Sequence, residues 1–144
     1  LSKGALLLVD YGFPRHEFYH PQRNTGTLMC HYRHHAHGDP FFLPGLQDIT
    51  AHVDFTAIVE SGFDAGLELL GYTTQAAFLL NCGLTEVLAR IPAEDHKRYL
   101  PQAQAANKLI SPAEMGELFK VLALGKGIDA TLIGFAQGDR SATL

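Results

Sequence analysis

The chain has 144 residues, of which 47% are hydrophobic and 18% are charged, and its formal net charge is -4. These values are typical of one globular domain and exclude a disordered polymer. The slightly acidic balance argues against a general nucleic-acid-binding protein, which would carry a basic face. The two cysteines form no Cys-x-x-Cys pair, and no apolar run suits a membrane span or a secretion signal. We therefore expect a reduced, intracellular protein.

The first predicted element is a strand over residues 5–9, Ala-Leu-Leu-Leu-Val, which is apolar at every position. Such a run is typical of the middle of a parallel sheet, where both faces are covered. Because later strand candidates are few and no initiator Met is present, we expect part of the sheet to precede residue 1. Asp10 and Tyr11 follow at the carboxyl end, where open α/β sheets bind ligands. They are candidate site residues, although Asp10 could merely cap the next turn.

A stretch rich in histidine and aspartate covers residues 26–54. It contains five of the eight histidines and three aspartates, namely His31, His34, His35, His37, His52, Asp39, Asp48 and Asp54. Titratable residues packed this densely between two apolar elements indicate a functional site. Residues 26–32 predict a short strand, whereas Pro40 and Pro44 predict irregular backbone over residues 38–45.

An amphipathic helix is predicted over residues 54–65. Its inward-facing stripe follows the spacing i, i+3, i+4, i+8 and consists of Phe55, Ile58, Val59 and Phe63. Asp48 or Thr50 is expected to cap the helix N-terminus, because either side chain can accept a bond from a free backbone N–H. Gly66 is well placed to end the helix.

The second half of the chain predicts short elements. Residues 67–72 favour a strand, and residues 76–82 and 85–91 favour two short helices. The alanine-rich, polar residues 93–109 predict a surface helix that Pro101 interrupts.

The C-terminal region predicts a further helix and a hairpin. Residues 111–114, Ser-Pro-Ala-Glu, form a capping box with proline in the first turn, which predicts a helix start. Residues 119–124 and 131–136 flank a Gly-Lys-Gly turn and predict a terminal antiparallel hairpin.

The histidines also raise a metal-dependent hydrolase as an alternative. Imidazoles are good zinc ligands, and Asp39 or Cys30 could complete a set with histidines from the group His31, His34, His35 and His37. However, the chain has no His-Glu-x-x-His motif and its spacing matches no zinc template, so we assign no metal ligand. The nucleophile elbow Gly-x-Ser-x-Gly, the phosphate loop and the dinucleotide fingerprint are also missing from the sequence.

Asp48, His52 and Asp54 cluster around the predicted start of the helix over residues 54–65. Free N–H groups and the helix dipole favour anions there. A histidine flanked by carboxylates can act as a base. The competing and more common explanation is that the two aspartates only cap and solvate the helix.

Six sequence blocks occur in one order along the chain. They are GALLLVDYG (residues 4–12), GTLMCHYRHH (26–35), Asp39-Pro40, PGLQDITAHVDF (44–55), GYTTQAAFLL (71–80) and MGELFKVLALGKG (115–127). Together they resemble the C-terminal half of the MidA family of S-adenosylmethionine-dependent methyltransferases. The mitochondrial members of that family assist assembly of respiratory complex I as protein arginine methyltransferases. The resemblance covers almost the whole chain.

The resemblance implies an α/β fold, the C-terminal part of a class I (Rossmann-like) methyltransferase. On that template residues 5–9, 67–72 and 119–124 are the fifth, sixth and seventh strands, and the last of them is antiparallel. S-adenosyl-L-methionine is the implied cofactor. The family's glycine-rich loop and ribose-binding acidic residue have no counterpart in these 144 residues. We therefore assign no cofactor-binding residue here and expect this segment alone to be inactive.

The resemblance also implies methylation of a protein, with arginine as the leading acceptor and this chain as the substrate-side wall. During arginine methylation the guanidinium must be held beside the methyl donor and must lose a proton as it reacts. Carboxylates or a neutral histidine suit both tasks. The candidate residues for the substrate cleft are Asp10, Tyr11, His35, Asp48, His52 and Asp54. The first alternative is a non-catalytic, methyltransferase-like assembly or dimerisation module. We expect the protein to be located in a bacterial cytoplasm or a mitochondrial matrix. We expect it to bind no nucleic acid and no membrane, and a homodimer is possible.

Overall fold

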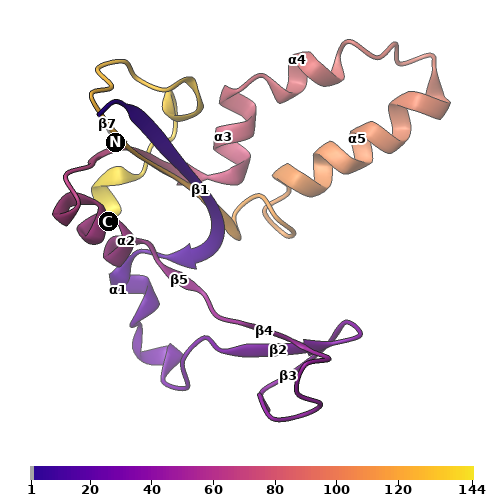
Figure 1. Cartoon of the computed structure of the whole chain (residues 1–144). Helices are drawn as coiled ribbons and strands as arrows, with labels where there is room; N and C mark the ends of the chain where they lie inside the picture. Colours follow the sequence, from indigo (N-terminus) through magenta and orange to yellow (C-terminus); the bar gives the residue numbers. More distant parts are fainter. Residues whose placement is uncertain (1) are drawn as a thin grey trace.

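A four-stranded mixed sheet organises residues 2–144, which the computed structural model describes (Figure 1). Its strand order is β5-β1-β7-β6, where β1 is Gly4–Phe13, β5 is Val53–Asp54, β6 is Glu68–Thr74 and β7 is Phe119–Lys126. β7 runs antiparallel to both of its neighbours, so β1 and β6 are parallel to each other. The three strands predicted from the sequence are confirmed, and so is the antiparallel direction of the last one.

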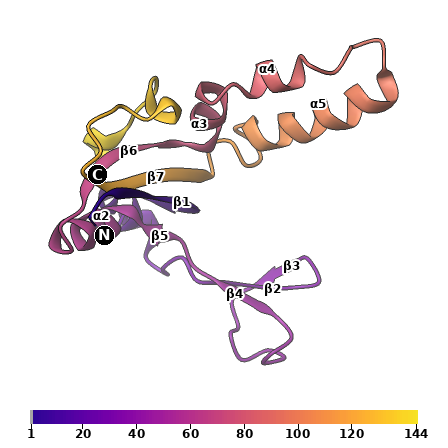
Figure 2. The same ribbon diagram turned by 45° about the horizontal axis from the view of Figure 1, so that its top comes forward.

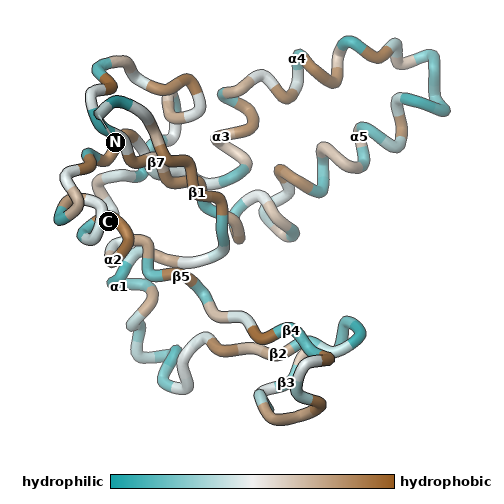
Figure 3. The backbone as a smooth tube through the Cα atoms, in the orientation of Figure 1, coloured by the Kyte–Doolittle hydropathy of each residue, from teal (hydrophilic) through white to brown (hydrophobic). Residues whose placement is uncertain are grey.

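β7 is the central strand of the sheet, and its sequence explains why. Residues 121–124, Val-Leu-Ala-Leu, are buried on both faces of the sheet. β1 and β6 pair with its two edges over almost its whole length. Figure 3 shows that hydrophobic residues concentrate along β1 and β7. Leu7 and Val9 of β1 nevertheless remain 48% and 51% exposed, so the described residues do not give β1 the complete burial that its sequence predicts.

The predicted terminal hairpin is wrong in its second strand. Residues 131–136 contain a 3-10 helix, η2 (Ile133–Phe135), instead of a strand. Because both edges of β7 already carry partners, no edge is left for a hairpin strand. Phe135 instead packs over the sheet against Val121 and Ala123.

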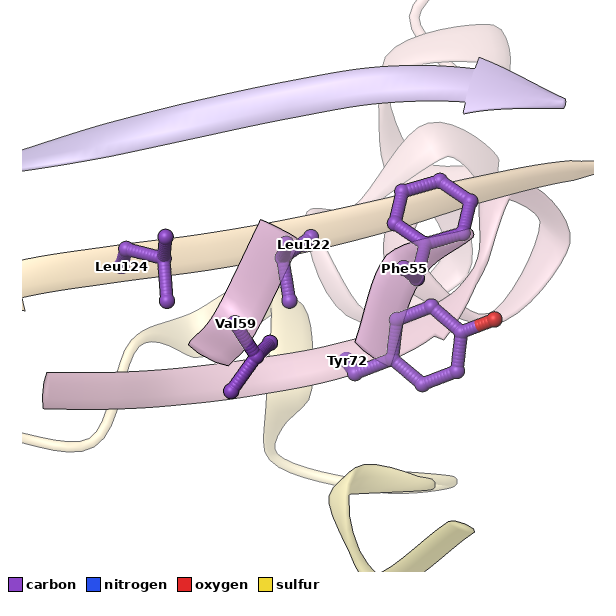
Figure 4. Packing of buried hydrophobic residues seen from close by; sticks show 5 residues of the cluster. All are labelled: Phe55, Val59, Tyr72, Leu122 and Leu124. Carbon is purple, nitrogen blue, oxygen red and sulfur yellow. The ribbon is translucent and has the colours of Figure 1, made fainter. Parts of the chain in front are cut away.

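Helix α2 (Phe55–Asp64) covers the opposite face of the sheet. Its buried residues Phe55 and Val59 pack against side chains of β6 and β7, and Figure 4 shows this cluster of Phe55, Val59, Tyr72, Leu122 and Leu124. The predicted apolar stripe is confirmed in the first two turns. It fails at Phe63, which is 54% exposed beyond the edge of the core.

The helix begins and ends with identifiable caps. Asp54 is the N-cap, and its Oδ1 accepts a hydrogen bond from the backbone N–H of Ala57 at 3.1 Å. The prediction that Asp48 or Thr50 caps this helix is therefore wrong, because β5 keeps the chain extended as far as Asp54. Gly66, at a φ of 76°, ends the helix as predicted. The N–H of Leu67 bonds back to the Gly62 carbonyl, which completes a Schellman motif.

Three helices follow β6 and extend away from the sheet (Figure 2). They are α3 (Gln75–Asn81), α4 (Leu84–Leu88) and α5 (His96–Ile110). Pro101 lies inside α5 without ending it, so the predicted interruption is wrong; proline there removes a single backbone bond from a long helix. The helix start predicted at residues 111–114 is also wrong. Ser111 caps the C-terminus of α5, and the chain then turns directly into β7.

A second small sheet forms an arm, defined here as residues 29–50. Its strands β2 (Met29–Tyr32), β3 (His35–His37) and β4 (Asp48–Thr50) are antiparallel, in the order β3-β2-β4. The predicted strand and the irregular residues 38–45 are both confirmed. The arm stands apart from the main sheet in both views (Figures 1 and 2).

Shorter helices complete the fold. α1 (Arg15–Phe18) and η1 (Pro21–Arg23) connect β1 to the arm, and η3 (Ser141–Thr143) lies near the C-terminus. Among residues 2–144, no helix combines the length and the apolar character that a membrane crossing requires.

Candidate functional site

An open cleft of about 1440 Å³ lies between the carboxyl end of β1 and the arm. The residues from the β1 side are Tyr11 and Phe13, and the arm contributes one face of β2 and β4. On that face His31 stands opposite Asp48 in the strand register, and Met29 stands opposite Thr50. The cleft is therefore aromatic on one side and of mixed polar and apolar character on the other. It lies at the carboxyl end of β1, the end of the strands where α/β proteins bind ligands.

The structure brings three of the six candidate residues to this cleft. Tyr11, Asp48 and His52 line it, whereas Asp10, His35 and Asp54 do not. The rings of Tyr11 and His52 meet edge to face with centroids 5.4 Å apart. The spatial grouping of Asp48, His52 and Asp54 around a helix start is not found, because Asp48 lies in β4, outside the helix.

His52 is held between aromatic rings. Phe13 stacks on it with centroids 4.9 Å apart and planes 23° apart. Its backbone N–H donates to Thr27 Oγ1 at 3.1 Å, and its ring Nδ1 is buried with no hydrogen-bond partner among residues 2–144. Burial lowers the pKa of His52, and the positive charge of Arg23 lowers it further. The imidazole is therefore neutral near pH 7 and keeps a lone pair for a proton.

Two residues beside His52 were not found by the sequence analysis. Arg23 lies over the Phe13 ring, with its Cζ 4.0 Å from the ring centroid, and donates to the Glu17 carbonyl. Phe13 ends β1 and Arg23 ends η1, and the sequence around them carries no pattern pointing to a site. Their proximity to His52 arises only when β5 pairs with the end of β1.

Lys120 is a third residue that the sequence analysis missed. It is only 9% exposed and stands opposite Asp10 in the register of β1 and β7. Burial lowers its pKa, and its Nζ donates to the Glu117 carbonyl. A lysine inside the apolar run of β7 is the signal that could have identified it.

Asp10 is exposed and accepts a hydrogen bond from the N–H of Tyr11 at 2.8 Å.

Asp54 has a structural role. Besides capping α2, its Oδ2 pairs with Arg15 Nε at 3.3 Å, and Arg15 also binds both carboxylate oxygens of Glu60. These contacts tie the end of β5 and the middle of α2 to α1. The alternative that the sequence left open, in which Asp54 serves as a helix cap, is confirmed.

The other arm histidines do not converge on one another. His31 and His34 line the cleft, whereas His35 is exposed in β3 and His37 packs against Phe42 with centroids 5.2 Å apart. Within the part of the chain that the structure describes, no three His, Cys, Asp or Glu side chains form a group that could hold a metal ion. The hydrolase alternative gains no support from this arrangement.

The cleft residues do not by themselves form a cradle for S-adenosyl-L-methionine. Asp48 is the one carboxylate among the described residues that line the cleft, and it stands on the exposed arm. The carboxyl end of β1 packs closely against β5, because a Cβ at Gly12 would collide with the Val53 carbonyl. We therefore assign no cofactor contact to the described residues and derive no step through the cofactor.

Relatives of known name share much of this chain. Protein arginine methyltransferase NDUFAF7, mitochondrial, from Danio rerio is 33% identical over 118 residues, 81% of this chain and 26% of that protein. The Bos taurus protein of the same name is 34% identical over 128 residues, 86% of this chain and 26% of that protein. The chain thus spans about a quarter of the length of these relatives.

Two crystal structures from Burkholderia thailandensis share its fold. One, of an uncharacterized protein, is 65% identical with a TM-score of 0.97, and the match covers 99% of this chain and 38% of that one. The other is bound to S-adenosyl-homocysteine and is 66% identical with a TM-score of 0.95, over 98% of this chain and 36% of that one. Both likenesses support the Rossmann-like methyltransferase fold.

The family model that matches residues 1–73 is described as "Putative S-adenosyl-L-methionine-dependent methyltransferase". That match spans half of the chain and includes β1, the arm and α2. The named relatives and the solved structures agree with it. The chain therefore belongs to this MidA-like family of S-adenosyl-L-methionine-dependent methyltransferases.

Proposed function

We propose that the protein containing this chain methylates a protein substrate on an arginine side chain, and that this chain forms the acceptor side of the cleft. The observation that carries the proposal is His52, a neutral imidazole that lines the cleft between Phe13 and Tyr11. The names of the relatives, protein arginine methyltransferases, support arginine as the acceptor.

The chemistry assigns separate tasks to the cleft residues. S-adenosyl-L-methionine supplies an activated methyl group when it is bound. A guanidinium nitrogen that gains a methyl group must release a proton, and the neutral His52 ring can accept that proton. The Asp48 carboxylate opposes the positive charge of the guanidinium, and the Tyr11 ring offers it an aromatic surface.

The proposal leaves the compartment and the assembly state of the protein open. The relatives carry the word mitochondrial in their names, whereas the matching crystal structures come from Burkholderia thailandensis. A mitochondrial matrix and a bacterial cytoplasm both remain part of the proposal. A non-catalytic assembly module is the competing function, and cofactor binding separates the two.

The test uses the intact protein that contains this chain, with His52→Ala as the variant and His96→Ala, at the exposed start of α5, as the control. We expect His52→Ala to lower kcat for arginine peptides by about 10²- to 10⁴-fold while calorimetric affinity for S-adenosylhomocysteine stays unchanged. His96→Ala should behave as wild type, and circular dichroism should show that both variants are folded.

Three outcomes would contradict parts of the proposal. A folded His52→Ala protein with wild-type turnover would remove the proton-accepting role. Methylation found by mass spectrometry on residues other than arginine would remove the acceptor assignment. A folded wild-type protein that binds no S-adenosylhomocysteine would favour the non-catalytic assembly module.

A further inference from the structure

The cleft is positively charged, although the chain as a whole has a formal net charge of -4. The described residues that line it include two arginines, Arg23 and Arg33, and a single carboxylate, that of Asp48. His31 and His34 add two imidazoles to the same lining. A local excess of positive charge on an acidic chain indicates an anionic ligand group.

Neither of the two cleft arginines pairs with a carboxylate among the described residues. Of the six arginines, Arg15, Arg98 and Arg140 pair with carboxylates. Within residues 2–144, Arg23 and Arg33 form no such pair and lie instead over the rings of Phe13 and Tyr32. Their charges therefore remain available to a ligand in the cleft.

The backbone fixes one of these charges at the rim of the cleft. Arg33 and His34 form the two-residue turn between β2 and β3, with φ angles of 48° and 67°. Left-handed backbone of this kind is unfavourable for residues that carry a side chain, and such strain concentrates at ligand-binding sites. Asn-Gly would form this turn with less strain, yet here the turn presents a guanidinium and an imidazole to the cleft.

The shape of the cleft indicates an extended ligand. One wall is the face of β2 and β4, two antiparallel strands, and the cleft continues past His52 to Tyr11 on the main sheet. An extended peptide could place its acceptor residue near His52 while its neighbouring residues reach Arg33 at the rim.

We propose that the cleft binds an extended segment of the protein substrate that carries aspartate or glutamate beside the methylated residue, with Arg33 contacting an acidic side chain. This proposal rests on the function proposed above and adds a sequence preference to it. Arg33 is a specificity-determining residue in this scheme, whereas His52 acts on the acceptor itself.

The test measures peptide affinity by fluorescence anisotropy in the intact protein saturated with S-adenosylhomocysteine. Three peptides share a central arginine and differ in two flanking residues, which are both Asp, both Asn or both Lys. We expect the Asp peptide to bind about tenfold more tightly than the Asn peptide, from two exposed charge contacts. This difference should shrink when salt is raised from about 0.05 M to about 0.5 M.

The variant Arg33→Glu should abolish the preference for Asp and favour the Lys peptide. The matched control is Arg90→Glu, because Arg90 also lacks an ion pair among the described residues but lies after α4, outside the cleft lining. That control should retain the wild-type preference. The affinity for S-adenosylhomocysteine should be the same in all three proteins, since Arg33 is assigned to the peptide.

The outcomes separate this proposal from the methyltransferase function itself. Equal affinity for the Asp, Asn and Lys peptides, with arginine methylation intact, would overturn the acidic preference alone. Loss of S-adenosylhomocysteine affinity in Arg33→Glu would also overturn it, because Arg33 would then bind the cofactor carboxylate. A further Asp-flanked peptide with a central alanine should still bind in preference to its Asn counterpart, so the preference can be confirmed even if arginine is not methylated.

Discussion

At the scale of single residues, the properties of His52 come from neighbours that are remote in the sequence. Phe13 stacks on the ring, Tyr11 meets it edge to face, and Arg23 lies over the ring of Phe13. The sequence pointed to Tyr11, Asp48 and His52 because titratable and aromatic residues gathered near an apolar strand. It could not identify Arg23, since a loop arginine has no local pattern that distinguishes it from a solvated one.

This arrangement makes a prediction for the pH dependence of activity. Burial lowers the pKa of His52 first, and then the charges of Arg23 and Lys120 lower it while Asp10 raises it. The base form should therefore persist below the ordinary histidine range near pH 6.5. Arg23→Gln removes one positive charge, so the pKa of His52 should rise and the acidic limb of kcat/KM should move to higher pH.

The measurement is a pH profile of kcat/KM together with NMR titration of the His52 ring in wild type and Arg23→Gln. Arg90→Gln is the charge-matched control and should leave both curves in place. An acidic limb that stays unchanged in Arg23→Gln, although the NMR titration of His52 shifts, would show that another group controls the profile.

At the scale of elements, helix α2 shows both the strength and the limit of periodicity. The spacing of Phe55, Ile58, Val59 and Phe63 correctly indicated a helix with an apolar face. Periodicity does not say how far the sheet beneath extends, so it placed Phe63 in the core, where the structure leaves it exposed. Local sequence was also misleading at Pro101. Proline predicts a break in the helix, but α5 continues through it.

Two phenylalanines of this helix provide a matched pair of variants. Phe55 is 0% exposed and packs against Tyr72, with ring centroids 5.3 Å apart, whereas Phe63 is 54% exposed. We expect Phe55→Ala to lower the free energy of unfolding by about 3–5 kcal/mol, through lost burial and a cavity. Phe63→Ala should change it by no more than about 0.5 kcal/mol.

Chemical denaturation of the intact protein, followed by circular dichroism, would measure both values. Equal effects of the two substitutions would contradict the assignment of Phe55 to the core and of Phe63 to the surface.

At the scale of the whole molecule, the C-terminal residues hold the end of β6 in place. Asp139 Oδ1 accepts hydrogen bonds from the Tyr72 N–H at 3.1 Å and from the Ser141 N–H at 3.0 Å. The Thr73 hydroxyl donates to the Gly138 carbonyl at 2.6 Å. These contacts connect segments remote in the sequence at β6, the edge strand opposite β5.

Asp139 gives this connection a pH dependence. Burial raises its pKa, but the hydrogen bonds from Ser141 and Tyr72 outweigh that effect, so the net pKa lies below the ordinary aspartate value. Because the pKa of this carboxyl is lower in the folded state than in the unfolded state, its ionised form stabilises the protein. This stabilisation is complete at pH values above the unfolded-state pKa. The stabilisation is lost as the pH falls through the folded pKa.

We therefore expect Asp139→Asn to lower the free energy of unfolding at pH 7 by about 1 kcal/mol, because solvent screens the exposed part of the carboxylate. The difference in free energy of unfolding between wild type and Asp139→Asn should become smaller below about pH 4, where aspartate becomes protonated. Urea titrations at several pH values would measure it, and a difference that stays constant down to pH 2 would contradict the hydrogen-bonded carboxylate.

The sequence by itself determined the strands β1, β6 and β7, the helix α2 and the family, because local apolar patterns and ordered sequence blocks carry that information. Only the tertiary structure decided that β7 is central, so that residues 131–136 find no free edge on β7. It also decided the start of α2, since the pairing of Phe13 with Asp54 keeps β5 extended and makes Asp54 the cap. The same pairing carries His52 onto Phe13 and Tyr11, a contact between distant residues that no local pattern encodes.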